Sequence, residues 1–158
     1  MVIKPTLKKT LFWVGIAILV IALGIQLIPI HRTNPPVSRE IKWDSPTTHE
    51  LAQRACLDCH SNTTVWPWES SIAPASLLIA NHVAEGRSRL NFSEWDKPNA
   101  DFEEVRRNVQ RGQMPPWDYM LMHPEAKLST AETQQLLAGL QTTFQQDPPI
   151  ARPERFRR

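Results

Sequence analysis

The sequence predicts an all-α protein in which a single transmembrane helix is followed by a small helical domain. Residues 11–30 form a run of twenty residues without a charged side chain, which is about the length that an α-helix needs to cross a bilayer. The rest of the chain lacks the alternating β-branched runs that are typical of strands. The 158 residues include 14 prolines and only 5 glycines, which suits helices joined by stiff, irregular connections.

Basic residues before the apolar run predict its orientation. Lys4, Lys8 and Lys9 precede it, whereas the basic residues just after it alternate with acidic ones. By the positive-inside rule the N-terminus is cytoplasmic and the body lies outside. A cleaved signal peptide is the alternative, but the run is long for one and offers no small-x-small cleavage site. We therefore expect residues 1–30 to be a cytoplasmic tip and an anchor in the inner (cytoplasmic) membrane of a bacterium, with a periplasmic body.

The body is divided by its prolines and by its charge pattern. Residues 31–44 contain Pro35-Pro36 and no helical periodicity, which predicts an extended linker. Residues 45–144 form the helical domain, and residues 145–158 form a basic, mobile C-terminal tail with four arginines. Without the N-terminal lysines the chain carries fifteen basic and sixteen acidic residues. This balance excludes the basic patch of a nucleic-acid-binding protein.

Four helices are predicted within the domain from capping residues and apolar spacing. The first begins at Ser45 or Thr47 and ends at Cys56, with Thr47 and Glu50 at the spacing of a capping box. The second and third span residues 74–86 and 101–111. The last begins at Ser129, is capped through Glu132, includes Phe144 and is ended by Asp147-Pro148-Pro149. In the second helix, a three-and-four spacing of apolar residues that includes Leu78, His82 and Val83 predicts one buried face.

The strongest chemical signal is the pentapeptide Cys56-Leu57-Asp58-Cys59-His60. Two thiols separated by two residues match the two vinyl groups of haem, and the adjacent imidazole reaches the iron. The sequence therefore predicts one covalent haem c, held by Cys56 and Cys59 and ligated by His60. A disulfide across so short a loop removes little chain entropy. A zinc site requires a second pair of Cys or His ligands, and the sequence contains none at a similar spacing. A thioredoxin-like redox pair requires a surrounding βαβ pattern, which is also missing.

The sixth iron position distinguishes an electron carrier from an open haem site. Met114 is the expected ligand, because its thioether is a soft donor that raises the reduction potential and Pro115-Pro116 stiffens its loop. His82, on the predicted buried face of the second helix, is the alternative and gives a bis-histidine haem of lower potential. The sequence alone does not decide between Met114 and His82 as the sixth ligand.

Aromatic residues suggest how a porphyrin is enclosed. Trp66, Trp68, Trp95 and Trp117 lie between the pentapeptide and the last predicted helix. In a body of this size we expect them partly to wall the porphyrin and partly to form the core.

Most of the body resembles the haem-binding-domain family of small membrane-anchored monohaem c-type cytochromes. The shared segments are CLDCHSN at 56–62, WPW at 66–68, AP at 73–74, EGR at 85–87, LNFSEW at 90–95, GQMP at 112–115 and HPEAKLS at 123–129. The resemblance implies a cytochrome c-like helical domain with one haem, and it supports Cys56, Cys59 and His60. The Met-Pro loop at Met114 is similar to that of cytochromes c in general, but it leaves His82 as a rival.

The function expected from these features is one-electron transfer by a haem on a membrane tether. The sequence contains no paired carboxylates, Ser-His-Asp set or glycine-rich phosphate loop. We therefore expect that the protein is not an enzyme. The redox partner proteins are not identified by the sequence. The alternatives are a haem-based sensor or peroxidase-like protein with an open iron site, and an accessory haem subunit of a membrane respiratory complex.

Overall fold

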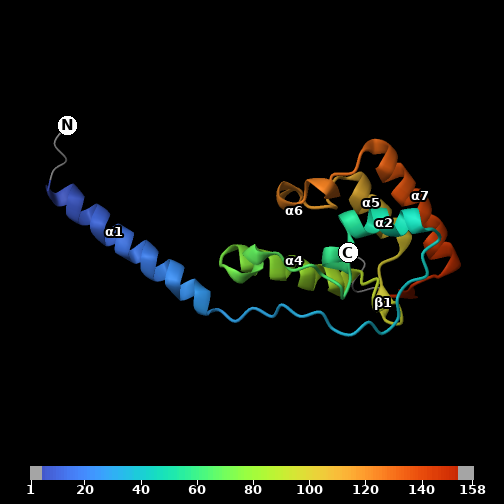
Figure 1. The fold of residues 1–158 in the computed structure, drawn as a ribbon, viewed down its shortest axis with the longest axis horizontal. Coiled ribbons are helices and arrows are strands. Elements are labelled where there is room, and N and C mark those ends of the chain that lie inside the picture. The colour runs from blue at the N-terminus through green and yellow to red at the C-terminus, as the bar shows by residue number, and fades with distance from the viewer. Residues whose placement is uncertain (1–4, 153–158) are drawn as a thin grey trace. The chain divides into compact units, whose positions relative to one another are not determined.

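The structure is a computed structural model that describes residues 5–152. By its internal contacts the chain divides into two compact units. The first contains the N-terminal residues up to 32 together with residues 66–81, and the second contains residues 33–65 together with the chain from residue 82 onward. Figure 1 shows that nearly all of the regular structure is helical, which confirms the all-α prediction.

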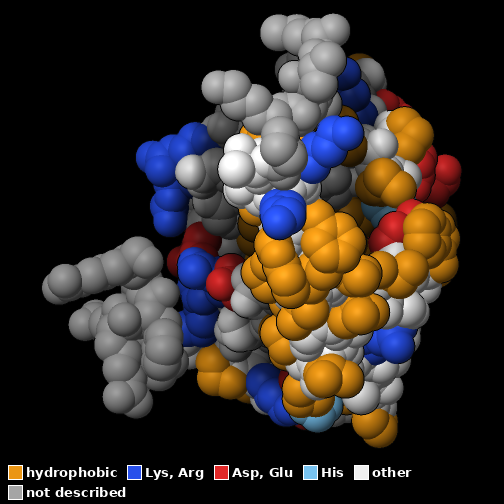
Figure 2. All heavy atoms as spheres, turned by 90° about the vertical axis from the view of Figure 1, so that its left-hand side faces the viewer, with side chains coloured by type: hydrophobic (Ala, Val, Ile, Leu, Met, Phe, Trp, Pro, Cys, Tyr) orange, Lys and Arg blue, Asp and Glu red, His pale blue; other side chains and the backbone are white. Residues whose placement is uncertain are grey.

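The first unit is built around one long apolar helix. Helix α1 spans Pro5–Gly24 and continues as a short 3-10 helix, η1, over Ile25–Leu27. The stretch Thr6–Leu27 is long and apolar enough to cross a membrane, and its most hydrophobic part is not buried against the rest of the protein. Its large side chains, among them Trp13 and Ile18, are exposed, and hydrophobic side chains gather on the face shown in Figure 2. The unit also contains η2, Trp68–Ser71, and the first half of α4, Ala75–Arg89.

The second unit contains the remaining elements. These are α2 (Pro46–Ala55), α3 (Leu57–His60), the end of α4, α5 (Phe102–Gln110), α6 (Trp117–Met122), η3 (Pro124–Ala126), α7 (Thr130–Gln146) and two short strands, β1 (Pro98–Asn99) and β2 (Ile150–Ala151). The strands pair in parallel, with Pro98 opposite Ile150. Helix α2 packs against α7.

The helix ends agree with the sequence in most places. The Ser129 hydroxyl accepts from the Glu132 amide and the Glu132 carboxylate accepts from the Ser129 amide, so the predicted capping box is present. The Thr47–Glu50 capping box is wrong, because Ser45 caps α2 through the Thr48 amide. Helix α4 continues three residues beyond Gly86, since a glycine within a helix costs only about 1 kcal/mol.

The buried face predicted for the second helix is only partly correct. Val83 is 3% exposed, but Leu78 is 49% exposed. Periodicity finds an apolar stripe along a helix but does not say which turns of it meet a partner.

An aromatic cluster forms the core of the second unit. Trp95 is fully buried, stacks on Phe92 with a ring-centroid distance of 5.9 Å and meets Phe144 edge-on at 5.1 Å. Its indole Nε1 donates to the Asp147 backbone oxygen at 3.0 Å, so the polar end of this ring is also satisfied. Leu136 and Leu140 of α7 complete the cluster.

The segment expected to be a linker is extended, but its second half packs on the core. The Ser38 amide donates to the Ser93 oxygen at 3.1 Å, the Trp95 amide donates to the Arg39 oxygen at 2.8 Å, and the Ile41 side chain is 3% exposed. The second half of the segment therefore runs beside residues 92–95, with an isolated parallel bridge between Arg39 and Glu94.

The start of the C-terminal tail also packs on this unit. Ile150–Ala151 form β2, and Arg152 pairs with Glu104 of α5. Arg155, Arg157 and Arg158 lie outside the described residues, as does Lys4 at the other end.

The contact between α2 and α7 yields a stability prediction. A Cβ atom at Gly139 would lie 2.9 Å from the Thr48 Cβ and closer still to the Thr48 hydroxyl. Helix propensity alone favours Gly139→Ala by about 1 kcal/mol, but overpacking costs about 1–3 kcal/mol. Because the added Cβ would lie well inside contact distance of the Thr48 hydroxyl, the upper part of the overpacking range applies, about 2–3 kcal/mol. We therefore expect a net loss of about 1–2 kcal/mol in urea unfolding of the full chain in detergent, followed by circular dichroism.

A double-mutant cycle separates this clash from other effects. Thr48→Ala removes the two atoms that extend beyond the Thr48 Cβ, so Gly139→Ala should cost less in that background. A Gly139→Ala chain that is as stable as the wild type contradicts the close helix crossing.

Candidate functional site

The pentapeptide of residues 56–60 forms a tight turn at the end of α2. The Cys56 amide closes α2 by donating to the Ala52 oxygen at 2.7 Å, and the backbone then leaves helical geometry at Cys56, with φ −131° and ψ −44°. The Cys56 oxygen accepts from the amides of Cys59 at 3.2 Å and His60 at 2.9 Å. Cys56, Cys59 and His60 are thus held on one turn, and both thiols are free.

The His60 ring is fixed in one tautomer by two backbone carbonyls. Its Nδ1 lies 2.9 Å from the Leu90 oxygen and 3.1 Å from the Gly86 oxygen. Because a carbonyl oxygen only accepts, Nδ1 carries the proton and donates to both. Burial lowers the pKa of His60 and keeps the ring neutral. Among the described residues Nε2 has no hydrogen-bond partner, which is the state that a metal-ligating histidine needs.

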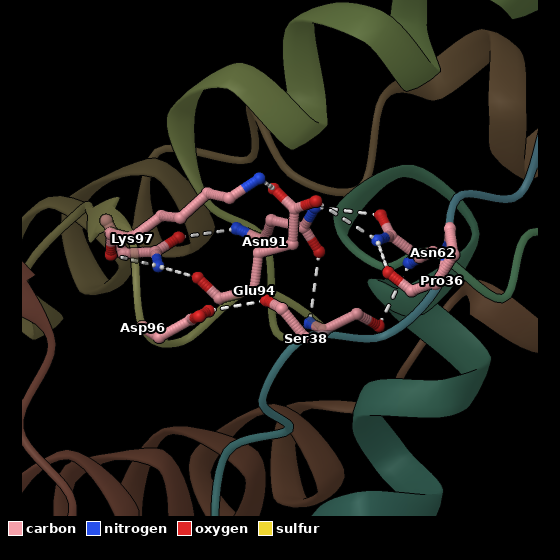
Figure 3. Close-up of polar contacts among 9 residues, drawn as sticks. Pro36, Ser38, Asn62, Asn91, Glu94, Asp96 and Lys97 are labelled. Carbon is pink, nitrogen blue, oxygen red and sulfur yellow. Dashed lines mark hydrogen bonds and ion pairs between the residues drawn. The ribbon is translucent and has the colours of Figure 1, made fainter.

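A buried network of side-chain amides holds the backbone next to Leu90, whose oxygen accepts the hydrogen bond from His60 (Figure 3). The Asn91 side-chain amide donates to the Asn62 side-chain oxygen at 2.9 Å, and the Asn91 backbone amide donates to the Asn99 side-chain oxygen at 2.6 Å. The Ser93 hydroxyl accepts from the Asn62 backbone amide at 2.9 Å. All four residues are no more than 4% exposed. The network fixes residues 90–95 beside the turn.

A glycine permits the close approach of α4 to the turn. A Cβ atom at Gly86 would lie 3.1 Å from the Cys59 Cβ and closer still to the Cys59 oxygen. Only a residue without a Cβ allows the Gly86 oxygen to come within reach of the His60 ring.

The turn faces an apolar cavity of the second unit. The cavity holds about 1110 Å³ of space including its opening to solvent, and Cys56, His60 and Met114 contribute to its wall. The rest of the wall is mainly aliphatic and includes Leu90, Val105, Val109, Leu128, Leu136 and Leu140. An apolar cavity with a few convergent donor groups is the usual form of a cofactor site.

A second cavity adjoins the same turn and brings the two rival ligands near it. It is lined by Cys59, His82, Tyr119 and others, and it shares Cys56, His60 and Met114 with the first cavity. Met114 therefore lines both cavities, whereas His82 lines only the second. The His82 Nε2 lies 3.7 Å from a carboxylate oxygen of Asp118. Both predicted ligands lie at the site.

The two thiols are held in the protonated state. Burial raises the pKa of Cys56 to about 12, and the charge of Cys59 adds to this shift. Burial and the Asp58 carboxylate raise the pKa of Cys59 to about 11. Thiols in this state react slowly in disulfide exchange.

The partners of Asp58 were not predicted from the sequence. Its side chain accepts from the Tyr119 hydroxyl at 2.8 Å and from the Val65 amide at 3.0 Å. These bonds tie α6 to the turn. Tyr119 is distant in sequence and lies on a helix that we did not predict, so no local pattern marks the pair. Buried beside this carboxylate, Tyr119 has a raised pKa and stays a neutral donor.

The expected role of the tryptophans is confirmed only for the core. Trp95 is fully buried in the core of the second unit, and neither Trp95 nor Trp117 of that unit lines either cavity. Trp117 is 73% exposed. The wall of the larger cavity is mainly aliphatic, with Phe92 rather than a tryptophan among its lining residues.

The donor set fits a haem. A neutral imidazole with a free Nε2, two thiols on the same turn and a thioether converge on an apolar cavity, and these are the groups that attach and ligate a haem of c type. Arg89 lines both cavities, and its guanidinium has no hydrogen bond or ion pair with the described residues, so it is available to a propionate.

Comparison with known proteins agrees with this fit. The family model described as a haem-binding domain matches residues 20–142, which include the turn, Gly86 and Met114. No curated protein and no solved structure matches the chain.

The close approach at Gly86 is testable by adding one methyl group. Gly86→Ala must push α4 away from the turn and weaken the bonds from His60 to the Gly86 and Leu90 oxygens. We expect the haem content per chain to fall by about half or more, measured by haemochrome absorbance against protein concentration.

Gly15→Ala is the matched control, because a Cβ at Gly15 meets nothing within 4 Å. A Gly86→Ala chain with full haem content and an unchanged spectrum contradicts the role given to this approach.

Proposed function

The chain belongs to the haem-binding-domain family, and from this premise we propose that it is a membrane-anchored c-type cytochrome with one covalent haem. The observation that carries the proposal is the state of the His60 ring. Its Nδ1–H donates to two backbone carbonyls, and its Nε2 has no hydrogen-bond partner among the described residues. His60 lines the same cavity as Cys56 and Met114. Ligation requires this tautomer, and c-type attachment requires thiols on the same turn.

Cys56 and Cys59 have the role of attachment. Each thiol would hold the haem through one thioether, formed by addition of the S–H across a vinyl group. Both thiols are free and lie on one turn with His60, which supports this assignment. Such bonds would retain the cofactor without depending on the iron bond.

Met114 has the role of distal ligand. It lines both cavities beside the turn, and it precedes two prolines in the loop between α5 and α6. The sulfur of this residue is neutral, so ligation brings no charge into an apolar site. His82, which lines one cavity and faces the Asp118 carboxylate, is the alternative ligand.

The activity proposed is one-electron transfer rather than catalysis. Bound haem supplies the exchange of one electron between ferrous and ferric iron. The chain's contribution is to fix His60, enclose the cofactor in aliphatic side chains and exclude water from it. The partners proposed are redox proteins at the membrane, which include the subunits of a respiratory complex.

The anchor proposed is the apolar helix Thr6–Leu27. The lysines before it predict a cytoplasmic N-terminus and an extracytoplasmic haem domain in the bacterial inner membrane. An anchor keeps the haem at a high local concentration near membrane-bound partners.

Covalent attachment is tested with the two cysteines. Cys56→Ala and Cys59→Ala each remove one thioether, so each single variant should keep haem by the other bond, whereas the double variant should lose it on denaturation. Haem staining after denaturing electrophoresis measures this. Haem that leaves the wild-type chain in acidified organic solvent would rule out the thioethers.

The distal ligand is tested by a spectrum of the ferric protein. With Met114 bound, we expect a low-spin haem with the weak far-red methionine-to-iron band, and Met114→Ala should abolish that band and lower the reduction potential. Met122→Ala is the matched control, because Met122 is 62% exposed and lines neither cavity.

The same measurement distinguishes the other interpretations. Loss of the low-spin spectrum in His82→Ala, with Met114→Ala unchanged, would assign the ligand to His82. A high-spin wild-type spectrum that responds to carbon monoxide or cyanide would favour a sensor or a peroxidase-like protein.

A further inference from the structure

A patch of exposed apolar side chains lies in the first unit, on η2 and the start of α4. Trp68 is 72% exposed, Ile72 50% and Leu78 49%. Together with Ala73, Pro74, Ala75 and one acidic residue, Glu69, they surround a shallow hollow of about 650 Å³, including its opening to solvent. We call residues 68–78 the apolar patch. Large apolar side chains gathered in this way mark a surface that meets a partner.

The apolar patch is hydrogen-bonded to the end of the apolar helix. Gln26, in the last turn of the Thr6–Leu27 stretch, donates from Nε2 to the Ala73 oxygen at 3.0 Å. The Ala73 amide returns a bond of 3.0 Å to the Gln26 Oε1. A reciprocal pair of bonds between one side chain and one backbone position fixes both distance and direction.

A second contact reinforces this attachment. Arg32, just beyond the apolar helix, donates to the hydroxyl of Ser71 in η2. The apolar patch therefore stays at the level where the apolar helix ends.

We propose that the apolar patch inserts into the headgroup and upper acyl region of the bilayer that α1 crosses. The inference rests on the proposed membrane anchor. If the helix spans the bilayer, Gln26 lies at its surface, and the bonds to Ala73 hold Trp68, Ile72 and Leu78 at the same depth. Tryptophan is enriched at this depth, because its ring is apolar and its N–H is polar.

The occupant is lipid rather than a protein, because of where the apolar patch is attached. A protein partner would have to displace the lipid that already surrounds the end of a single span. The basic side chain of Arg32 beside the apolar patch suits anionic headgroups. The segment then acts as an interfacial element that limits rotation and tilt about the anchor.

Two isoleucines provide a matched test. Ile72 and Ile150 are each 50% exposed, so structure alone predicts equal access of water to a cysteine at either position. Ile72→Cys and Ile150→Cys full chains, loaded with haem, are placed in vesicles of phosphatidylethanolamine and phosphatidylglycerol. A membrane-impermeant maleimide should label Ile72→Cys at least about fivefold more slowly than Ile150→Cys. Rates are compared, so the fraction of inward-facing protein cancels.

Controls keep this comparison specific. The wild-type chain measures labelling of Cys56 and Cys59, and each variant must keep the wild-type haem spectrum. In denaturant the two new cysteines should react at the same rate. Equal rates in vesicles would overturn the inference.

A second measurement uses the unmodified chain and separates the two hypotheses. A phospholipid with a diazirine on its acyl chain is photolysed in the same vesicles, and modified peptides are identified by mass spectrometry. We expect adducts on α1 and on residues 66–81. Adducts on α1 alone would refute the apolar patch and leave the anchor intact, even if Ile72→Cys is protected. No adducts on either segment would refute the proposed anchor itself.

Discussion

The hydrogen bonds from His60 Nδ1 to the Leu90 and Gly86 oxygens are the interaction on which the site depends. They select the tautomer, set the plane of the ring and leave Nε2 without a proton. Each requires a specific backbone position. The Leu90 oxygen is placed by the buried network of Asn62 and Asn91, and the Gly86 oxygen by a helix crossing that no side chain larger than hydrogen permits. The network of residues 62 and 91 and the helix crossing at Gly86 thus position the two carbonyl groups that orient His60.

The segment LNFSEW at residues 90–95 joins this site to the core. Its polar side chains form the amide network, and the Phe92 amide donates to the His60 oxygen at 2.8 Å. Its aromatic side chains, Phe92 and Trp95, form the cluster that packs against α7. A polar residue without a partner in such a buried segment would be costly, so the segment is constrained on both sides. Its distinctive sequence thus reflects two tasks in six residues.

Local features were predictable from the sequence, and long-range contacts were not. The extent of α5, the cap of α7, the apolar helix at the N-terminus and the turn with two cysteines all follow from residues within a few positions of one another. The partners of His60 lie 26 and 30 residues away, and spacing cannot reveal them. Composition suggested that the tryptophans serve partly as porphyrin wall and partly as core, and it could not say which ring does which. Trp95 is a core residue and lines neither cavity.

The two sides of the site differ in how firmly they are held, and this difference bears on function. His60 has two hydrogen bonds and a buried network behind them. Met114 belongs to a loop, is 37% exposed, and has its backbone amide 3.3 Å from the Asn108 oxygen. If His60 ligates the iron as proposed, its firm attachment would hold the iron in either role. The proposed bond from Met114 would then decide between exchange of electrons alone and binding of small ligands, and this bond lies at the less constrained position.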